Sequence, residues 1–404
     1  MLIGKMKKKY MDEGRTDWKE TIEKIGTGSF YLAVIIEIIL VIIDKSEFIY
    51  PYEGRTFRIT FLLCLIKVLF TKYKEKEYLV VGLFLGLGFI SYQVTGRNEI
   101  LRIIMFVAAC KNINMIQCLK MVFWMTLTGC TVIILLSITG IYGSLTLTQD
   151  FGRGGIETRY VLGMGHPNAL QCMVWMLSSL GMYLYHTHWK WYHYTIVWLT
   201  NLLFFLITAS KTSMTIVTLT VILFLTADHL KTERSKKLFS TVNIAAVVCS
   251  VVSSVFIAKD AMCLWDYFWG GELTYKVRIY LLLNKILTGR IHSLIETRNH
   301  EGIMDTWSLF SSPHNTYYFD MGWVRLFYWY GVIPGIIIVV CMLFLMGYFY
   351  KKDRLFEIIM FAVYSIYTVA EAHIISAYIG RNYLLFIAGM FWWKMQIKTG
   401  KQDE

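Results

Sequence analysis

The chain has 404 residues, of which 56% are hydrophobic, 16% aromatic and 17% charged, and its mean hydropathy is +0.50. Soluble domains carry about one quarter charged residues, so this composition excludes a large soluble core. The formal net charge of +12 comes from lysines and arginines spread over many loops, which argues against a nucleic-acid-binding face. The eight cysteines lack the CxxC spacing of a metal site and lie mostly in apolar runs, so no disulfide framework is expected.

Apolar runs recur along the chain, and most are long enough to cross a hydrocarbon core of about 30 Å. The sequence predicts an all-α polytopic membrane protein, a single integral membrane domain over residues 1–404 with about twelve spans. The polar, basic residues 1–27 are expected to form a cytoplasmic tail rather than a signal peptide. An even number of spans returns the C-terminus to the cytoplasm, and the excess of Lys and Arg in the cytoplasmic loops agrees with this orientation. The predicted spans are 28–44, 57–71, 78–94, 99–110, 121–143, 167–185, 193–209, 212–228, 240–258, 323–350, 355–376 and 382–393.

Two extracytoplasmic segments, 144–166 and 259–322, are much longer than the others, and loops of this length are usually structured or functional. The second is expected to contain a helix, because apolar residues recur in it at helical spacing. This helix either rests on the outer membrane interface or packs on the bundle. The apolar positions are Tyr275, Ile279, Leu282, Leu283 and Ile286, flanked by Lys276, Arg278 and Lys285.

Arginine and lysine are divided unevenly between the two faces of the predicted topology. The cytoplasmic segments hold 20 Lys and 3 Arg, whereas the extracytoplasmic segments hold 5 Lys and 8 Arg. Arginine binds phosphate and carboxylate groups through two parallel hydrogen bonds. We therefore expect an anionic ligand at the outer face, and a pyrophosphate on a lipid carrier fits. The outer arginines are Arg55, Arg97, Arg153, Arg159, Arg278, Arg290, Arg298 and Arg381.

Turn-forming and polar residues gather in front of two of the predicted spans. Gly163 and Gly165 allow a tight turn, and Pro167 suits the first turn of the following helix. In "TASKTS", residues 208–213, Lys211 lies at the tip of a short turn, and serine and threonine side chains suit a helix cap. Both helix starts offer backbone N–H groups to an anion, or else are ordinary capped turns.

Four motifs occur in order: "RYVLGMGHPN" at 159–168, "TASKTS" at 208–213, "LNKILTGRI" at 283–291 and "DMGWVRLFYWYGVIPG" at 320–335. This ordered set resembles the motifs of Wzy-type bacterial O-antigen, capsular and exopolysaccharide polymerases, within the O-antigen ligase and polymerase superfamily. The second motif departs from the family, because Lys211 and Ala209 replace its usual arginine and glycine.

The resemblance implies a polysaccharide polymerase of the bacterial cytoplasmic membrane. It would join undecaprenyl-pyrophosphate-linked oligosaccharide repeats at the outer face, as a glycosyltransferase without metal or cofactor. Its partners would be the lipid bilayer, a flippase and a chain-length regulator, with no nucleic acid. An O-antigen-type ligase with another acceptor and a transporter of lipid-linked oligosaccharide are the alternatives. The expected site consists of Asp320 and His166 as candidate catalytic bases, and Arg159, Arg290, Lys211, Arg325, Asn168 and Ser213 for pyrophosphate and sugar binding.

Overall fold

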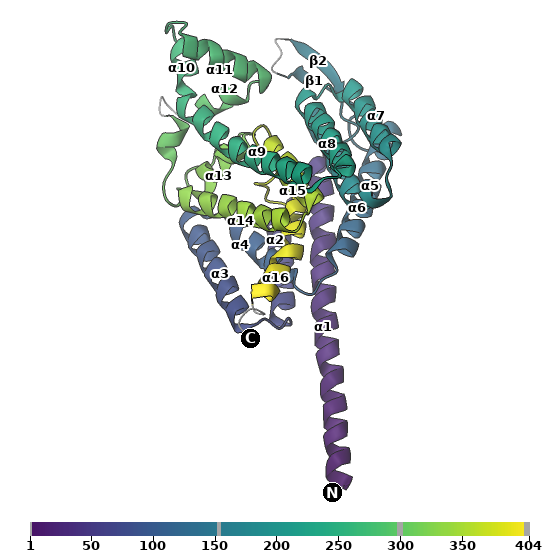
Figure 1. Ribbon diagram of the computed structural model, residues 1–404. Helices are drawn as coiled ribbons and strands as arrows, with labels where there is room; N and C mark the ends of the chain where they lie inside the picture. Colours follow the sequence, from purple (N-terminus) through teal and green to yellow (C-terminus); the bar gives the residue numbers. More distant parts are fainter. Residues whose placement is uncertain (1, 152–154, 297–301, 400–404) are drawn as a thin grey trace.

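The structure is a computed structural model that describes residues 2–151, 155–296 and 302–399 (Figure 1). Helices make up most of it. Within the described residues, six helical segments are long and apolar enough to cross a membrane, and two shorter apolar helices, Leu355–Thr368 and Tyr383–Met395, accompany them. A helix satisfies its own backbone hydrogen bonds, which is what a bilayer requires. The chain is therefore a helical membrane protein. The six segments are Glu20–Lys45, Glu75–Thr95, Met115–Ile138, Lys211–His229, Glu233–Phe268 and Val332–Lys351.

The first five helices form the N-terminal part of the bundle. They are α1 (Leu2–Lys45), α2 (Glu53–Leu69), α3 (Glu75–Thr95), α4 (Glu99–Ala109) and α5 (Met115–Ile138). The polar tail predicted at 1–27 is not a separate segment, because α1 runs without a break from Leu2 into the first apolar span. Its N-terminal half projects far beyond the other helices in Figure 1.

The segment predicted at 144–166 contains a β-hairpin, so the fold is not purely α-helical. Strand β1 (Thr146–Asp150) pairs antiparallel with β2 (Ile156–Tyr160), and Thr148 faces Thr158 with their hydroxyls 2.8 Å apart. Alternating threonines favour this pairing. The helices that follow are α6 (Pro167–Tyr185), α7 (Trp191–Thr208), α8 (Lys211–His229) and α9 (Glu233–Asp260), with the short 3₁₀ helix η1 (His186–His188) before α7.

The long segment 259–322 is built from short helices. These are α10 (Met262–Phe268), α11 (Tyr275–Ile286), α12 (Arg290–Ile295) and the 3₁₀ helix η2 (Ile303–Thr306). The helix predicted there is confirmed as α11. In Figure 1, α10–α12 and the hairpin lie at the end of the molecule opposite the N-terminus of α1.

Two predicted spans have different ends in the structure. The span at 323–350 is two helices, α13 (Gly322–Tyr330) and α14 (Val332–Lys351), broken at Gly331 with φ of +97°. The backbone of residues 308–311 packs into this break, and a Cβ at Gly331 would lie 2.6 Å from the Leu309 carbonyl oxygen. The span at 355–376 ends early, because α15 stops at Thr368 and a non-helical segment, 369–378, follows. The chain closes with η3 (Ile379–Arg381) and α16 (Tyr383–Thr399).

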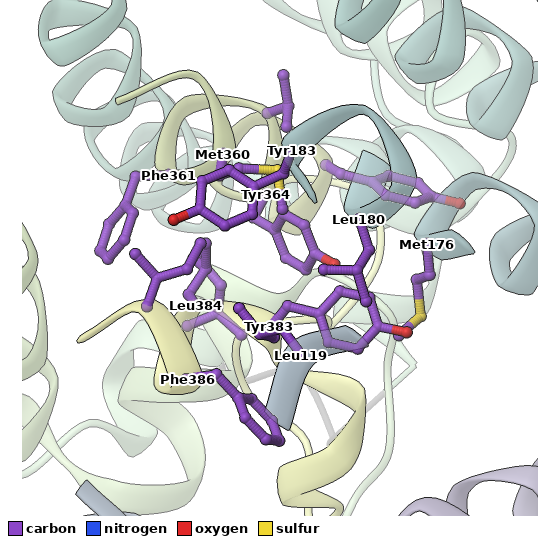
Figure 2. Packing of buried hydrophobic residues seen from close by; sticks show 14 of the residues in the cluster. Leu119, Met176, Leu180, Tyr183, Met360, Phe361, Tyr364, Tyr383, Leu384 and Phe386 are labelled. Carbon is purple, nitrogen blue, oxygen red and sulfur yellow. The ribbon is translucent and has the colours of Figure 1, made fainter. Parts of the chain in front are cut away.

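Helix α15 (Leu355–Thr368) is the centre of the apolar core. It is largely apolar and buried on nearly all sides, and it packs against α6, α8, α9, α14 and α16, which is typical of a helix enclosed by others. Figure 2 shows this packing, in which side chains from α5, α6, α15 and α16 meet. The labelled residues are Leu119, Met176, Leu180, Tyr183, Met360, Phe361, Tyr364, Tyr383, Leu384 and Phe386.

A buried ion pair joins α1 and α4 to the segment after α15. Arg102 Nη2 donates to Glu37 Oε1 over 2.7 Å, and both side chains are at most 3% exposed. Arg102 Nη1 donates to the Ala377 carbonyl over 2.7 Å, and Glu37 Oε2 accepts from the Ile379 N–H over 3.2 Å. A charge pair in an apolar bundle needs hydrogen bonds of this kind, although the buried Arg102 Nε has no acceptor among the described residues. It holds residues 377–379 in place, next to Arg381.

Candidate functional site

Arg159 reaches the site from the hairpin. It lies in β2 opposite Leu147 and is only 5% exposed. Its Nε donates to Glu157 Oε2 over 2.9 Å, and its guanidinium carbon lies 3.9 Å from the centre of the Phe151 ring. The edge of Phe151 in turn contacts the His166 ring, with centroids 5.7 Å apart. Phe151 therefore connects Arg159 to the start of α6.

The turn before α6 fixes the orientation of His166. Gly163 has φ of +77° and Gly165 +61°, and a Cβ at Gly163 would lie 2.9 Å from Ile133, so the predicted tight turn is confirmed. Pro167 is the first helical residue, as predicted. The Asn168 backbone N–H donates to His166 Nδ1 over 3.2 Å. A neutral imidazole that accepts at Nδ1 carries its proton on Nε2.

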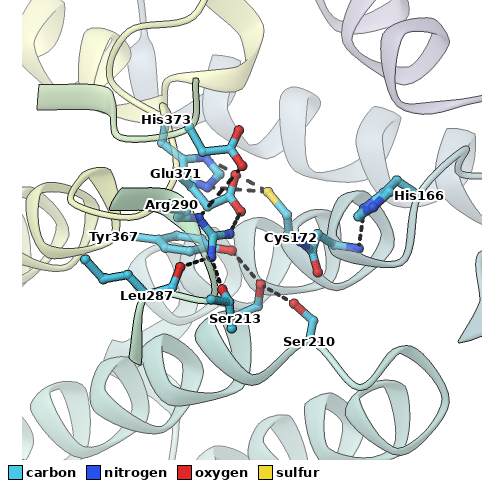
Figure 3. Close-up of polar contacts among 12 residues, drawn as sticks. His166, Cys172, Ser210, Ser213, Leu287, Arg290, Tyr367, Glu371 and His373 are labelled. Carbon is cyan, nitrogen blue, oxygen red and sulfur yellow. Dashed lines mark hydrogen bonds and ion pairs between the residues drawn. The ribbon is translucent and has the colours of Figure 1, made fainter. Parts of the chain in front are cut away.

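Arg290 is the central cation of the site. It begins α12 directly after Gly289, which has φ of +84°, and it is 7% exposed. Its Nη1 donates to the Leu287 carbonyl over 3.0 Å and to the Thr288 hydroxyl, and its Nη2 pairs with the Glu371 carboxylate (Figure 3). Within the described part of the chain, its buried Nε has no hydrogen-bond acceptor and lies 3.8 Å from an Asp320 oxygen.

The carboxylates beside Arg290 differ in access to solvent. The Asp320 side chain is 40% exposed, whereas that of Glu371 is 16% exposed and is held by Arg290. Gly322 allows this arrangement, because a Cβ there would lie 2.8 Å from the Ala372 Cα. Although desolvation opposes its charge, the neighbouring Glu371 and Asp320 raise the pKa of Arg290, so it stays cationic.

The His166 imidazole is close enough to Asp320, Arg159 and Arg290 for their charges to act on it. Burial lowers the pKa of His166; the Asp320 carboxylate opposes this, while Arg159 and Arg290 add to it. Three of the four motifs thus contribute charged groups to one region. The imidazole is expected to be neutral near pH 7.

Ser213 and Lys211 from the second motif play different parts. Ala209 ends α7 in the left-handed conformation, with φ of +52°. Ser210, at the N-cap of α8, donates its hydroxyl to Ser213 Oγ over 3.0 Å, and among the described residues its side chain accepts no backbone N–H of α8. The Ser213 side chain is 1% exposed, and its hydroxyl lies 2.5 Å from the Tyr367 hydroxyl of α15 (Figure 3); its expected role in ligand binding stays a prediction. Lys211 is exposed, and Asn168 is partly buried.

Arg325 lies in a second cluster, with Arg97. Its guanidinium carbon is 4.0 Å from the Tyr318 ring centre and 4.8 Å from that of Trp329, which Arg97 also contacts at 4.4 Å. Arg325 is 2% exposed. Its buried Nε and Nη2 have no hydrogen-bond acceptor among the described residues, and its expected role in pyrophosphate binding stays a prediction. Two of the outer arginines, Arg153 and Arg298, lie outside the described residues.

Sequence reasoning left Arg381, Glu371 and Lys45 out of the site. The Arg381 guanidinium interacts electrostatically with Glu371 and Asp44. Lys45, at the end of α1, interacts electrostatically with His373. Glu371 and His373 fall within the span predicted at 355–376, but they lie in the non-helical segment 369–378. The predicted place of Arg381 among the outer arginines was the only sequence signal for it, because Asp44 and Cys172, which act on its charge, lie far from it in the chain.

His373 occupies an aromatic environment. It is fully buried, and its ring lies 4.4 Å from that of Tyr367 and 5.2 Å from that of Trp175. Its Nε2 is 3.6 Å from Cys172 Sγ (Figure 3). Across the described residues, His, Cys, Asp and Glu side chains form no group of three or more placed to hold a metal ion.

The chain matches no family model, no curated protein and no solved structure. The site combines two buried arginines, an exposed carboxylate and a neutral imidazole at one end of a membrane-embedded bundle, which suits the handling of an anionic ligand by hydrogen bonds and charge.

Proposed function

We propose that the protein is a polysaccharide polymerase that joins oligosaccharide repeats carried on a lipid pyrophosphate at the outer face of the bacterial cytoplasmic membrane. The observation that carries the proposal is the convergence of Arg159, His166, Arg290 and Asp320 from three motifs that are far apart in the chain. The order of those motifs supports a polymerase among enzymes that use such donors. A flippase and a chain-length regulator would act in the same pathway.

The arginines would stabilise the leaving group. In the transfer, the bond between the anomeric carbon and the pyrophosphate oxygen breaks, and a bond to an acceptor hydroxyl oxygen forms. The electron pair leaves with the pyrophosphate, whose growing charge requires preorganised cations. Arg290 has a buried Nε–H without an acceptor among the described residues, and Arg159 is equally enclosed. An entering phosphate would compete with Glu371 and Asp320 for Arg290.

Asp320 is the better candidate for the base that accepts the hydroxyl proton. Of the two carboxylates beside Arg290, Asp320 is more exposed than Glu371. The contact of Asp320 with Arg290 is a 3.8 Å ion pair rather than a hydrogen bond. His166 accepts from the backbone through Nδ1, so its free nitrogen is a donor in the neutral form. His166 is therefore suited to donate a hydrogen bond to phosphate or sugar oxygen.

The test uses cells that carry the intact polysaccharide pathway but lack this protein. They are complemented with wild type, Arg290→Ala, Asp320→Asn or His166→Gln, and the lipid-linked glycan is sized. Arg55→Ala is the matched control, because Arg55 is an exposed arginine whose cation contact is Tyr52 at 5.4 Å. We expect single lipid-linked repeats to accumulate with Arg290→Ala, with polymer formation reduced about 100-fold.

The other outcomes distinguish the alternatives. If cells without the protein still make long lipid-linked polymer but do not transfer it, the protein is a ligase and not a polymerase. Single repeats confined to the inner leaflet would instead indicate a transporter. Full polymerisation by both Arg290→Ala and Asp320→Asn, at wild-type protein levels, would refute the proposed site.

A further inference from the structure

Helix α11 exposes one continuous apolar face, which we name the α11 stripe. It consists of Tyr275, Ile279, Leu282 and Ile286, whose side chains are 81%, 39%, 59% and 64% exposed. Their spacing of four, three and four residues places them along one side of the helix. The opposite side holds Val277 and Tyr280, which are 4% and 8% exposed. Large exposed apolar patches mark interaction sites.

The charges of α11 are all basic. Arg278 and Lys285 are exposed, and each follows a member of the α11 stripe by three residues, which places it beside that member on the helix surface. Lys276 Nζ pairs with Asp260 Oδ1 at 2.7 Å. An apolar face flanked by basic side chains is typical of helices that lie in the plane of a bilayer surface with anionic lipids.

The attachment of α11 to α9 places α11 beside the end of the apolar surface of α9. The Tyr280 hydroxyl donates to the Phe256 carbonyl over 3.0 Å, near the C-terminal end of α9, which ends at Asp260. Val242 and Phe256 of this helix are 59% and 60% exposed, so the apolar outer surface of α9 continues up to the contact with α11. Helix α9 itself ends at the charged residues Lys259 and Asp260. Charged residues at the end of a spanning helix are typical of the boundary between the hydrocarbon core and the aqueous phase.

We infer that the α11 stripe is seated on the surface of the bilayer and that Arg278 and Lys285 bind anionic lipid headgroups. Helix α11 is also joined firmly to Arg290. The Leu287 carbonyl and the Thr288 hydroxyl, directly after α11, accept hydrogen bonds from Arg290 Nη1. Asn284 Oδ1 of α11 accepts the His292 N–H over 3.0 Å. Lipid charge would therefore act on the position of Arg290. This inference goes beyond the proposed glycan chemistry and does not depend on it.

The test measures where a nitroxide on the stripe lies. Cys249, Cys263 and Cys341, the three cysteines that are not buried, are replaced by serine, and a spin label is attached at Leu282→Cys in protein reconstituted into nanodiscs. Labels at Val242→Cys and Glu272→Cys are the lipid-facing and water-facing references, because both side chains are exposed. Oxygen collects in the bilayer and a nickel chelate in water. We expect the oxygen-to-nickel accessibility ratio at Leu282 to exceed that at Glu272 several-fold.

The role of the basic residues is tested by lipid composition. Replacing part of the phosphatidylcholine by phosphatidylglycerol should raise the ratio at Ile286→Cys, and the double variant Arg278→Gln, Lys285→Gln should abolish this rise. An unchanged reading of the Val242→Cys label shows that each variant is folded and inserted. Nickel accessibility at Leu282 equal to that at Glu272 in both lipids would overturn the inference. So would an immobile label shielded from both reagents, which would mean that a protein chain covers the stripe.

Discussion

Arg102→Met is expected to destabilise the protein strongly, because it leaves the Glu37 carboxylate buried without its cation. Both side chains of this pair are at most 3% exposed. Removing one partner of a buried ion pair costs about 3–5 kcal/mol. Glu37 keeps two donors, the Thr60 hydroxyl at 2.6 Å and the Ile379 N–H at 3.2 Å. We therefore place the loss at the lower end, about 3 kcal/mol.

A double-mutant cycle with Glu37→Gln isolates the charge interaction. The neutral amide removes the uncompensated charge, so Glu37→Gln combined with Arg102→Met should cost less than the sum of the two single changes. Contacting pairs show coupling free energies of about 0.5–3 kcal/mol, and for this buried pair we expect about 2 kcal/mol. Methionine preserves packing on the Phe57 ring, whose centre is 3.7 Å from the Arg102 guanidinium carbon.

The assay is equilibrium unfolding of the purified protein in mixed micelles. Arg55→Met is the matched control, because this exposed arginine should change the free energy of unfolding by less than about 0.5 kcal/mol. If Arg102→Met lies within that same margin of the wild type, the buried pair does not hold the bundle to residues 377–379. The reasoning from burial to stability would then be refuted.

Three further predictions concern strained turns and pH. Ala209→Gly should raise the free energy of unfolding by about 1 kcal/mol, because Ala209 has φ of +52°; an unchanged midpoint in the same assay would contradict this. Gly331→Ala should lower it by about 3 kcal/mol, since φ is +97° and the new Cβ would meet the Leu309 carbonyl; a wild-type midpoint would mean that the helix break relaxes freely. Burial lowers the pKa of His166, so the unfolded chain takes up a proton near pH 6.5 before the folded chain does. The contribution of neutral His166 to the free energy of unfolding is thus fully present above that pH and is lost as the pH falls below it. The drop in unfolding temperature from pH 7.5 to pH 5.5 should therefore be smaller for His166→Gln than for the wild type.

Helices of the bundle were largely predictable because apolar periodicity and length are local properties of the sequence. The α11 helix and the turn at Gly163 to Pro167 were confirmed for the same reason. The hairpin at 146–160 was missed, since its strands are short and polar and are defined by pairing with each other. The break at Gly331 was missed because it depends on the distant backbone of residues 308–311.

The candidate site shows the same division. Glycine, proline and histidine next to a span pointed to residues 159–168, and arginine enrichment pointed to Arg290. The pairing of Arg290 with Glu371, 81 residues away, could not be predicted, because no local pattern encodes which carboxylate a buried arginine meets. Arg325 shows the converse, since its motif placed it in the site whereas its aromatic contacts place it with Arg97.

Composition and the length of the apolar runs were enough to predict a helical membrane protein. Residue type and spacing were enough to predict that polar side chains gather in a few segments, because these are local properties of the sequence. The tertiary structure alone decided that His166, Arg290 and Asp320 lie together, that Ser213 supports Tyr367, and that the α11 stripe faces outward. Side chains from distant segments share an environment only once the helices have packed, and the exposure and partners of each charge are set by that packing.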